Sequence, residues 1–581
     1  MVDSPDNPPL NFRSRRSPTI CTHGVAAASQ PLAAEIGLRV LRSGGNAADA
    51  CVAMAAALNC VEPCMTGIGG DAFCLYFDAA SGEVHGLNGS GRSPAALDLA
   101  TAQASLDAPG RIALDPSSPH CVTVPGAAAA WCDAIERFGS MPLAAVLQPA
   151  MDLAEEGFPV NVVAATQWAA QEAQLTRWGA SNPGASALLR DGKAPKAGEL
   201  MRMPELASTF RALAERGKAG FYSGRVASAV CEVLQAHGGL MTEADLAAHR
   251  STFDSPVCVD FRGVKVWEMP PSGQGLVALL ALRTLSRLPQ LDSLPHNSAE
   301  YLHLVAEALR LAFADGAACI GDGGGEAGAA EEIARLLSDE YSAARASLVN
   351  SEQAAEHLPA AAAALASTGT DTVYMTAVDG QGNACSFINS NFMGFGSGLV
   401  PRGCGFSLQN RGANFLLTEG HPNSLAPGKR PYHTIIPGMA TVGRELFASF
   451  GVMGGFMQPQ GHVQVLLNML QHKMDPQAAL DAPRLCVEAT GGAVGLQEPA
   501  SRHSSGVVLL LEDGIPDEVA EELRRKGHAV RGPVCGEGRL VFGKGQVIQR
   551  RAVPSPPGAE GPRAVLWAGS DGRADGAALG W

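Results

Sequence analysis

A threonine that begins a strand directly after a featureless stretch has the setting of a nucleophile made by cleavage of its own chain. Thr372 opens the alternating pattern TVYMTAVD, and residues 351–370 before it are alanine-rich and typical of an exposed linker. A threonine hydroxyl is a weak nucleophile that needs a base. If the bond after Asp371 were cut, the α-amine of Thr372, with a reference pKa of ~7.7–8.0, could be that base. The pattern alone still favours a simpler explanation, because threonine also begins strands for its β propensity.

The same hydroxyl could make the cut. Its oxygen would attack the Asp371 carbonyl, move the acyl group from nitrogen to oxygen, and leave an ester that water hydrolyses. Such chemistry needs N–H donors for an oxyanion. Gly454 and Gly455 lie between a predicted strand and a predicted helix start, where backbone amides are unobstructed and the helix dipole favours negative charge. A Gly-Gly pair at this place is also typical of a plain tight turn.

The elements that must position these residues follow from periodicity. Residues 30–350 predict mainly helices, including a buried helix in GGNAADACVAMAAALN that Asn46 caps. From residue 372 the period changes to two, and hairpins are predicted at 372–392 and 437–453. A helix is expected after Gly455 and another after Asp475. Short paired strands with helices packed on them predict an α+β fold built in layers.

Composition restricts the function classes. The 581 residues carry a net charge of −14 and no long basic run, which argues against nucleic-acid binding. The 14 cysteines are dispersed, and Cys60 and Cys64 lack the second ligand pair of a zinc site, so free thiols in a reducing compartment and no metal are expected. No secretory signal and no apolar run of about 18 residues are recognised. A cytoplasmic protein without membrane contact is therefore expected.

Several motifs, taken in their order and spacing, resemble one family. They are GGNAADA (44–50), GIGGDAF (67–73), VPG (124–126), LAEEGFPV (153–160), GTDTVYMTAVD (369–379), GFGSG (394–398), KRPYHTIIP (429–437), MGGFMQPQGH (453–462) and GSDGRADG (569–576). From about residue 12 to residue 581 the chain resembles the gamma-glutamyltransferase (glutathione hydrolase) family of N-terminal-nucleophile hydrolases, in its glutathione hydrolase-like branch. This resemblance places the nucleophile hypothesis for Thr372 above the β-propensity explanation.

The resemblance implies a four-layer αββα sandwich formed jointly by two chains of one precursor. A large chain, residues 1–371, would end in the linker at about 351–370, and a small chain, residues 372–581, would remain with it as a heterodimer. Thr372 would be the nucleophile, with Ser390 as an assisting hydroxyl. Gly454 and Gly455 would be the oxyanion-hole donors. γ-Glutamyl amides such as glutathione would be cleaved through an acyl-Thr372 ester that water or an amine resolves, without metal or organic cofactor.

At the substrate-binding positions the sequence departs from the family. Where typical members hold the substrate α-carboxylate with an arginine, Ser90 stands here, and Arg92 two residues on could substitute. A glutamine and an aspartate that grip the α-amino group are replaced by Arg411 and Asn414. Arg411 would repel an ammonium group and could pair with a carboxylate instead, unless it makes a structural salt bridge.

A further departure concerns the serine pair that usually contacts the carboxylate, which here is His433 and Thr434. These changes leave three functions open. The protein could act on γ-glutamyl amides, or as an acylase or small-amide amidohydrolase on a glutaryl-amide or oxamate-like substrate that lacks an α-amine. It could also be a non-catalytic relative that binds a metabolite, although the presence of Thr372, Ser390, Gly454 and Gly455 together argues against this.

Overall fold

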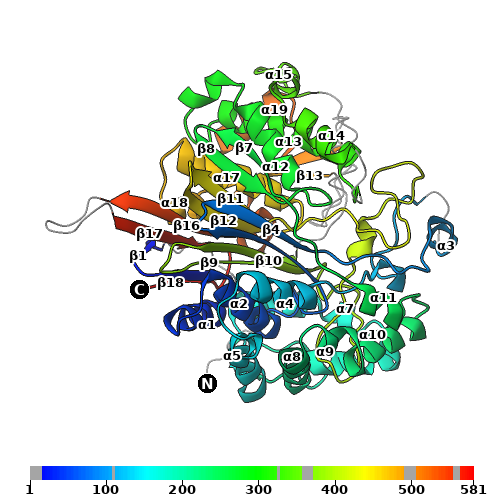
Figure 1. Ribbon diagram of the computed structural model, residues 1–581. Coiled ribbons are helices and arrows are strands. Elements are labelled where there is room, and N and C mark those ends of the chain that lie inside the picture. Colours follow the sequence, from blue (N-terminus) through cyan, green and yellow to red (C-terminus); the bar gives the residue numbers. More distant parts are fainter. Residues whose placement is uncertain (1–15, 107–110, 324–327, 356–370, 490–505, 554–562) are drawn as a thin grey trace, which may run out of the picture.

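Two antiparallel β-sheets stacked face to face form the centre of the protein (Figure 1). The computed structural model describes residues 16–106, 111–323, 328–355, 371–489, 506–553 and 563–581. Within these residues one sheet has seven strands, in the order β1 (Thr19–Cys21), β17 (Arg563–Ser570), β16 (Lys544–Val553), β12 (Glu445–Met453), β11 (Gly438–Val442), β8 (Val264–Glu268) and β7 (Val257–Phe261). The other has six, in the order β18 (Ala577–Gly580), β2 (Val25–Ala28), β9 (Asp371–Val378), β10 (Ala384–Phe392), β3 (Asp71–Asp78) and β4 (Glu83–Gly89).

Helices cover the outer faces of both sheets, which confirms the predicted four-layer αββα architecture (Figure 1). The six-stranded sheet carries α1 (Pro31–Arg42), α2 (Ala47–Val61) and α4 (Ala127–Phe138). The seven-stranded sheet carries α12 (Gly275–Leu285), α17 (Met457–Leu470) and α18 (Pro476–Asp481), with α13 (Ala299–Cys319) packed behind α12. Each interface between a sheet and its helices contains a large apolar core, which supplies the main stabilisation of such layers.

Two further groups of elements extend these layers. Behind α2 lie α5 (Leu143–Glu156) and the helices that follow it, α6 (Val162–Ala170), α7 (Glu172–Thr176), α8 (Pro204–Arg216), α9 (Ala219–Tyr222), α10 (Arg225–Ala236) and α11 (Glu243–Ala248), with the short pair β5 (Phe158–Pro159) and β6 (Leu200–Met201). Near α13 lies a small sheet of β13 (Leu485–Ala489), β14 (Val507–Glu512) and β15 (Val530–Val534), with α19 (Asp517–Arg525). The remaining helices are α3 (Leu99–Ala104), α14 (Ala329–Leu336) and α15 (Asp339–Ala346). In the described part of the chain, no helix has both the length and the apolarity to cross a bilayer.

Each large sheet contains strands from both sides of residue 372. In the six-stranded sheet, β9 and β10 lie between β2 and β3, and in the seven-stranded sheet β1 and β8 flank the strands of the C-terminal part. The two predicted chains would therefore share both sheets, and separating them would break ladders in each layer. Cleavage itself stays a prediction, and residues 356–370 of the expected linker lie outside the described residues.

Local expectations agree with the structure at the elements that matter for the site. Asn46 and Asp49 form a capping box at the start of α2, and every residue of α2 is buried between the sheet and α5. The hairpins β9–β10 and β11–β12 are present, and Asp475 caps α18 with its side chain.

Candidate active site

Thr372 is the second residue of β9 and lies almost fully buried between the two sheets. Side chains of a strand alternate, so Thr372 shares a face with Thr376, whose hydroxyl oxygen is 2.6 Å from Ser449 Oγ on the facing sheet. Thr372 Oγ1 donates a hydrogen bond to Ser390 Oγ over 3.1 Å. The two predicted hydroxyls are thus in direct contact.

A β-bulge directly opposite Thr372 aims Ser390 at it. Between the pairs Asn389–Val373 and Phe392–Asp371, β10 has one residue more than β9. Phe392, which ends the bulge, has a φ of +77°, a region that bulky side chains rarely adopt, and its N–H donates to Ser390 Oγ over 2.9 Å. Bulges of this kind re-aim side chains beside active sites. The sequence analysis did not predict it.

Arg411 is the third member of this contact chain. It begins a short 3-10 turn, Arg411–Asn414, and its side chain is fully buried. Its Nη2 donates to Ser390 Oγ over 3.2 Å and its Nη1 to Thr434 Oγ1 over 2.6 Å, while the guanidinium lies 4.4 Å from the centroid of the Phe392 ring. No carboxylate among the described residues forms an ion pair with it, so the expected alternative of a salt bridge is not what holds Arg411.

The charge of Arg411 is only weakly compensated. Burial lowers the pKa of Arg411 to about 9, and the negative charge of Asp71 partly opposes this shift. The Nε atom of Arg411 is a buried donor without a hydrogen-bond partner among the described residues. A buried, unpaired donor of this kind is costly unless a ligand satisfies it.

Asp71, the first residue of β3, is a buried carboxylate that the sequence analysis did not single out. Its Oδ1 accepts from the backbone N–H groups of Gly91 (3.0 Å) and Gly126 (3.1 Å) and from Gln409 Nε2 (3.0 Å). Burial raises the pKa of Asp71 to about 6, and Arg411 and these donors limit the rise. The only signal in the sequence was an acid inside the glycine-rich motif GIGGDAF.

His433 and Thr434 connect Asp71 to Arg411. His433 Nε2 lies 3.0 Å from Asp71 Oδ2, and the N–H of Ile435 points at Nδ1 over 3.4 Å, so the ring proton belongs on Nε2. Burial, with the positive charge of Arg411, holds the pKa of His433 far below its usual value, and the ring is neutral. Thr434 receives the Arg411 hydrogen bond directly, so both residues belong to this cluster.

The glycine pair lies where a strand meets a helix, as expected. Gly454 and Gly455 link β12 to α17 with φ values of +135° and +55°, which favour glycine. The Nε2 group of Gln274 donates to the carbonyls of Gly455 (2.9 Å) and Thr434 (2.6 Å), which ties this turn to the Arg411 cluster. The oxyanion role of the two glycines stays a prediction.

The other two residues predicted to bind substrate, Arg92 and Asn414, have protein partners of their own, and their role in substrate binding stays a prediction. Arg92 forms an ion pair with Asp322 over 3.1 Å and contacts the carbonyl of Gly428. Asn414 donates through Nδ2 to the carbonyl of Tyr432 over 3.1 Å. Over the described residues, no group of three or more histidine, cysteine or acidic side chains is arranged to hold a metal ion.

Comparisons with known proteins point to one family. The Gamma-glutamyltranspeptidase family profile matches residues 33–581. The Glutathione hydrolase-like YwrD proenzyme of Bacillus subtilis is 35% identical over 553 residues, which cover 94% of this chain and 97% of that protein. The Oxamate amidohydrolase proenzyme of Klebsiella pneumoniae is 32% identical over 575 residues, covering 97% of this chain and all of that protein.

A solved structure gives the same result for the fold. The crystal structure of cephalosporin acylase from Bacillus halodurans matches with a TM-score of 0.84 at 39% identity, covering 100% of this chain and 99% of that one. Family profile, full-length relatives and fold agree, and the protein belongs to the gamma-glutamyltranspeptidase family of N-terminal-nucleophile hydrolases.

Proposed function

We propose that this protein is a precursor that cleaves itself between Asp371 and Thr372 and then hydrolyses amides through an ester on Thr372. The observation that carries the proposal is the buried hydrogen bond from Thr372 Oγ1 to Ser390 Oγ, at the start of a strand that follows the linker. In the uncleaved chain Thr372 as a whole residue is 1% exposed, so the proposed nucleophile is buried before processing.

The proposed chemistry uses one hydroxyl twice. In processing, Thr372 Oγ bonds to the Asp371 carbonyl carbon and its proton passes to the leaving nitrogen, so that the C–N bond breaks and the α-amine is freed. Water then hydrolyses the resulting ester, which restores the Thr372 hydroxyl and leaves Asp371 with a free carboxylate. In turnover, this amine takes the proton from Oγ while Oγ attacks the substrate carbonyl, and it then passes the proton to the leaving nitrogen. Water, or an amine acceptor, resolves the acyl ester in the same way. The N–H groups of Gly454 and Gly455 are the proposed donors to the oxyanion.

For the acyl group we propose a small acid whose carboxylate pairs with Arg411. The unpaired Nε of that guanidinium, buried within two hydrogen bonds of Thr372, supports this proposal, because a carboxylate would satisfy both the donor and the charge. Asn414 offers only a neutral amide for an α-ammonium group. The name of one relative, an oxamate amidohydrolase proenzyme, agrees with an acyl group that lacks such an amine.

A γ-glutamyl amide such as glutathione is the second candidate. The name of the Bacillus subtilis relative, a glutathione hydrolase-like proenzyme, favours it. Arg411 argues against it, because its positive charge would repel the α-ammonium group of a γ-glutamyl substrate.

A gel tests the first proposal. Purified wild-type protein should give two bands, corresponding to residues 1–371 and 372–581, and Thr372→Ala should give one. Thr376→Ala is the matched control, because it also removes a buried β9 hydroxyl with a serine partner and should still be cleaved. A wild-type protein that stays intact and inactive would favour a non-catalytic relative and refute the proposal.

A substrate panel tests the second. Oxamate, glutaryl-p-nitroanilide, γ-glutamyl-p-nitroanilide and glutathione should be compared by kcat/KM. We expect the first two to be preferred, and Arg411→Gln combined with Asn414→Asp should raise turnover of the γ-glutamyl substrates. Preference of the wild type for glutathione would reverse the order of the two candidates.

A further inference from the structure

Two opposite charges are buried beside the nucleophile, and the proposed chemistry gives a role to only one of them. Arg411 Nη2 contacts Ser390 Oγ, which contacts Thr372 Oγ1, so the guanidinium lies two hydrogen bonds from the attacking oxygen. Asp71 is the register partner of Ser390 across the β3–β10 pair. Both charged side chains are fully buried, where water screens little of their field.

We propose that the buried charges of Arg411 and Asp71, which are not in contact with each other, together set the proton affinity of the Thr372 α-amine, and with it the pH range of catalysis. This inference rests on the proposed function, because that amine exists only after cleavage. Arg411 and Asp71 act here as positioning residues through their fields and take no proton from the substrate.

The sign of each effect follows from electrostatics. The threonine nitrogen is joined to Oγ1 through only two carbon atoms, so Arg411 lies close to the ammonium form and disfavours it. At a separation of about 8 Å and an effective dielectric constant of about 20, the amine pKa falls by about 1.5 units. Asp71 acts in the opposite direction and more weakly, because four hydrogen-bond donors surround its carboxylate.

The other ionisable groups around Arg411 and Asp71 do not reverse the effects of these two charges on the amine pKa. His433 faces Asp71 and is neutral, because burial and the charges of Arg411 and Arg430 hold its pKa far down. Arg430 lies on the same segment as His433 and adds to the positive field. Tyr222 of α9 is buried, which raises its pKa well above the usual value and keeps it neutral.

The test is the pH dependence of kcat/KM, which reports the groups of the free enzyme. It uses cleaved protein and a panel substrate that does not titrate between about pH 5.5 and 9. The acid limb should move up by about 1.5 pH units in Arg411→Met and down by about half a unit in Asp71→Asn. Arg411→Lys, which keeps the charge, should lose activity yet keep a limb near that of wild type.

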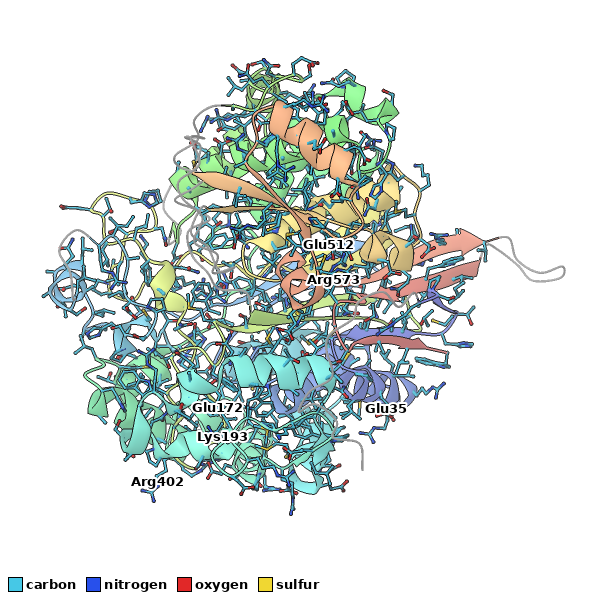
Figure 2. The ribbon with its side chains drawn as sticks, turned by 180° about the vertical axis from the view of Figure 1, so that it is seen from behind. Glu35, Glu172, Lys193, Arg402, Glu512 and Arg573 are labelled. Carbon is cyan, nitrogen blue, oxygen red and sulfur yellow. The ribbon has the colours of Figure 1, made fainter. Side chains whose placement is uncertain are left out.

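Shifts of the acid limb in opposite directions in the two variants would identify the proposed electrostatic role, because a merely structural role would lower kcat without moving the limb. Arg402→Met and Asp191→Asn are the matched controls, since both side chains are exposed (Arg402 is labelled in Figure 2) and neither should move it. Limbs that stay fixed, or that shift in the same direction in Arg411→Met and Asp71→Asn, would overturn the inference.

A direct measurement covers the case in which a variant is not cleaved. The pH dependence of acetylation at the Thr372 amine, followed by mass spectrometry in the cleaved wild type, should give a pKa below the reference value of ~7.7–8.0. A value at or above that reference overturns the inference while the proposed function stands. A wild type that is never cleaved overturns the proposed function instead.

Discussion

Two clusters of buried charge in this protein have opposite electrostatic character. Beside Thr372, Arg411 and Asp71 do not touch, and burial dominates both, lowering the pKa of the arginine to about 9 and raising that of the aspartate to about 6. In the C-terminal part, Arg573 and Glu512 meet directly in the interior (Figure 2). Both clusters lie out of solvent, so the contrast comes from how their charges are paired.

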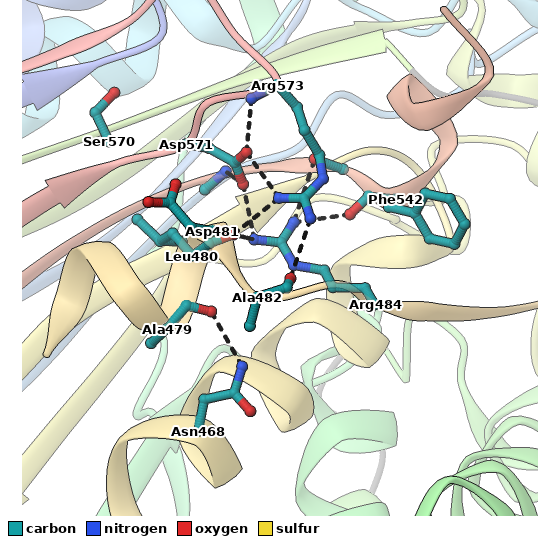
Figure 3. A network of polar contacts seen from close by, with 12 residues as sticks. Asn468, Ala479, Leu480, Asp481, Ala482, Arg484, Phe542, Ser570, Asp571 and Arg573 are labelled. Carbon is teal, nitrogen blue, oxygen red and sulfur yellow. Dashed lines mark hydrogen bonds and ion pairs between the residues drawn. The ribbon is translucent and has the colours of Figure 1, made fainter. Parts of the chain in front are cut away.

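In the second cluster, every nitrogen of the Arg573 guanidinium has a partner. Nε and Nη2 donate to the two carboxylate oxygens of Glu512 over 2.6 and 2.5 Å, and Nη1 donates to Asp571 Oδ1 over 3.0 Å and to the carbonyl of Leu480 over 2.8 Å. Arg484 Nη2 donates to the other oxygen of Asp571 over 2.7 Å (Figure 3). Burial raises the pKa of Asp571, but the attraction of the two arginines outweighs it and brings the value to about 2.

The comparison distinguishes an arginine whose donors are all satisfied within the fold from one with an unsatisfied donor beside the proposed nucleophile. Direct pairing and saturated donors give Arg573 a structural role, because removing it would take one arginine partner from each of two buried carboxylates, Glu512 and Asp571. Arg411 donates only to neutral hydroxyl groups, and its Nε has no acceptor among the described residues. This arrangement is typical of a site that binds a ligand. Perturbed pKa values that persist at the cost of stability are characteristic of functional sites.

The largest expected effect tests this distinction through stability. In a Thr372→Ala background, which keeps one chain, Arg573→Met should lower the free energy of unfolding by about 3–5 kcal/mol, because two buried carboxylates each lose one of their arginine partners. Arg411→Met should lower it by less than about 1.5 kcal/mol, since a poorly compensated charge leaves with it. Denaturant unfolding measures both, and equal losses would remove the distinction.

The next effect compares two buried hydroxyl pairs on the same strand. Ser390→Ala should slow self-cleavage and turnover by about 10–100-fold, because Thr372 loses the acceptor that orients its hydroxyl. Ser449→Ala also takes the partner from a β9 threonine, Thr376, and should change both rates less than about threefold. A time course of band intensities on gels measures the rate of self-cleavage, and kcat measures turnover. Equal slowing would mean that Ser390 only packs.

The smallest effect concerns the pH dependence of stability. Folding raises the pKa of Asp71 from 3.8 to about 6, so between these values only the folded state holds the proton, and stability falls as pH rises through about 6. In the Thr372→Ala background, Asp71→Asn should therefore raise the unfolding free energy at pH 8, on the order of 1–3 kcal/mol. This gain should disappear toward about pH 4, where the wild-type carboxyl is protonated in both states.

Asp571→Asn should have the opposite effect on stability to Asp71→Asn. Its folded pKa of about 2 lies below the ordinary value, so the carboxylate contributes stability above about pH 4 that is lost as pH falls toward 2. The substitution should therefore destabilise the protein at pH 8. Denaturant unfolding at several pH values measures both variants, and destabilisation of similar size by both would contradict the assignment.

Much of the site could be predicted from sequence, because its members lie in patterned elements. The alternation after residue 372, the Asn46 cap of α2 and the strand-to-helix turn at Gly454 depend on neighbours within a few positions. Thr372 and Ser390 are in contact as predicted, and the Arg411 position, known from the family motifs, joins them.

Other features depend on distant segments and could not be predicted in this way. Asp71 draws its four donors from four separate stretches of chain, so its importance appears only when these are brought together. The bulge opposite Thr372 is a property of the β9–β10 register rather than of either strand. Arg92, chosen by its closeness in sequence to a family position, pairs with Asp322 instead.

The sequence by itself determined which residues could react: a threonine that begins a strand, a serine on the next strand, and an arginine where the family uses uncharged or acidic groups. Tertiary structure alone decided their electrostatic state, because burial and long-range pairing set the energy of each charge. Arg411 and Arg573 are the same residue type, both buried. One lacks direct counter-charges and lies beside Thr372, the proposed nucleophile, while every guanidinium nitrogen of the other is paired with a partner in the C-terminal part of the chain.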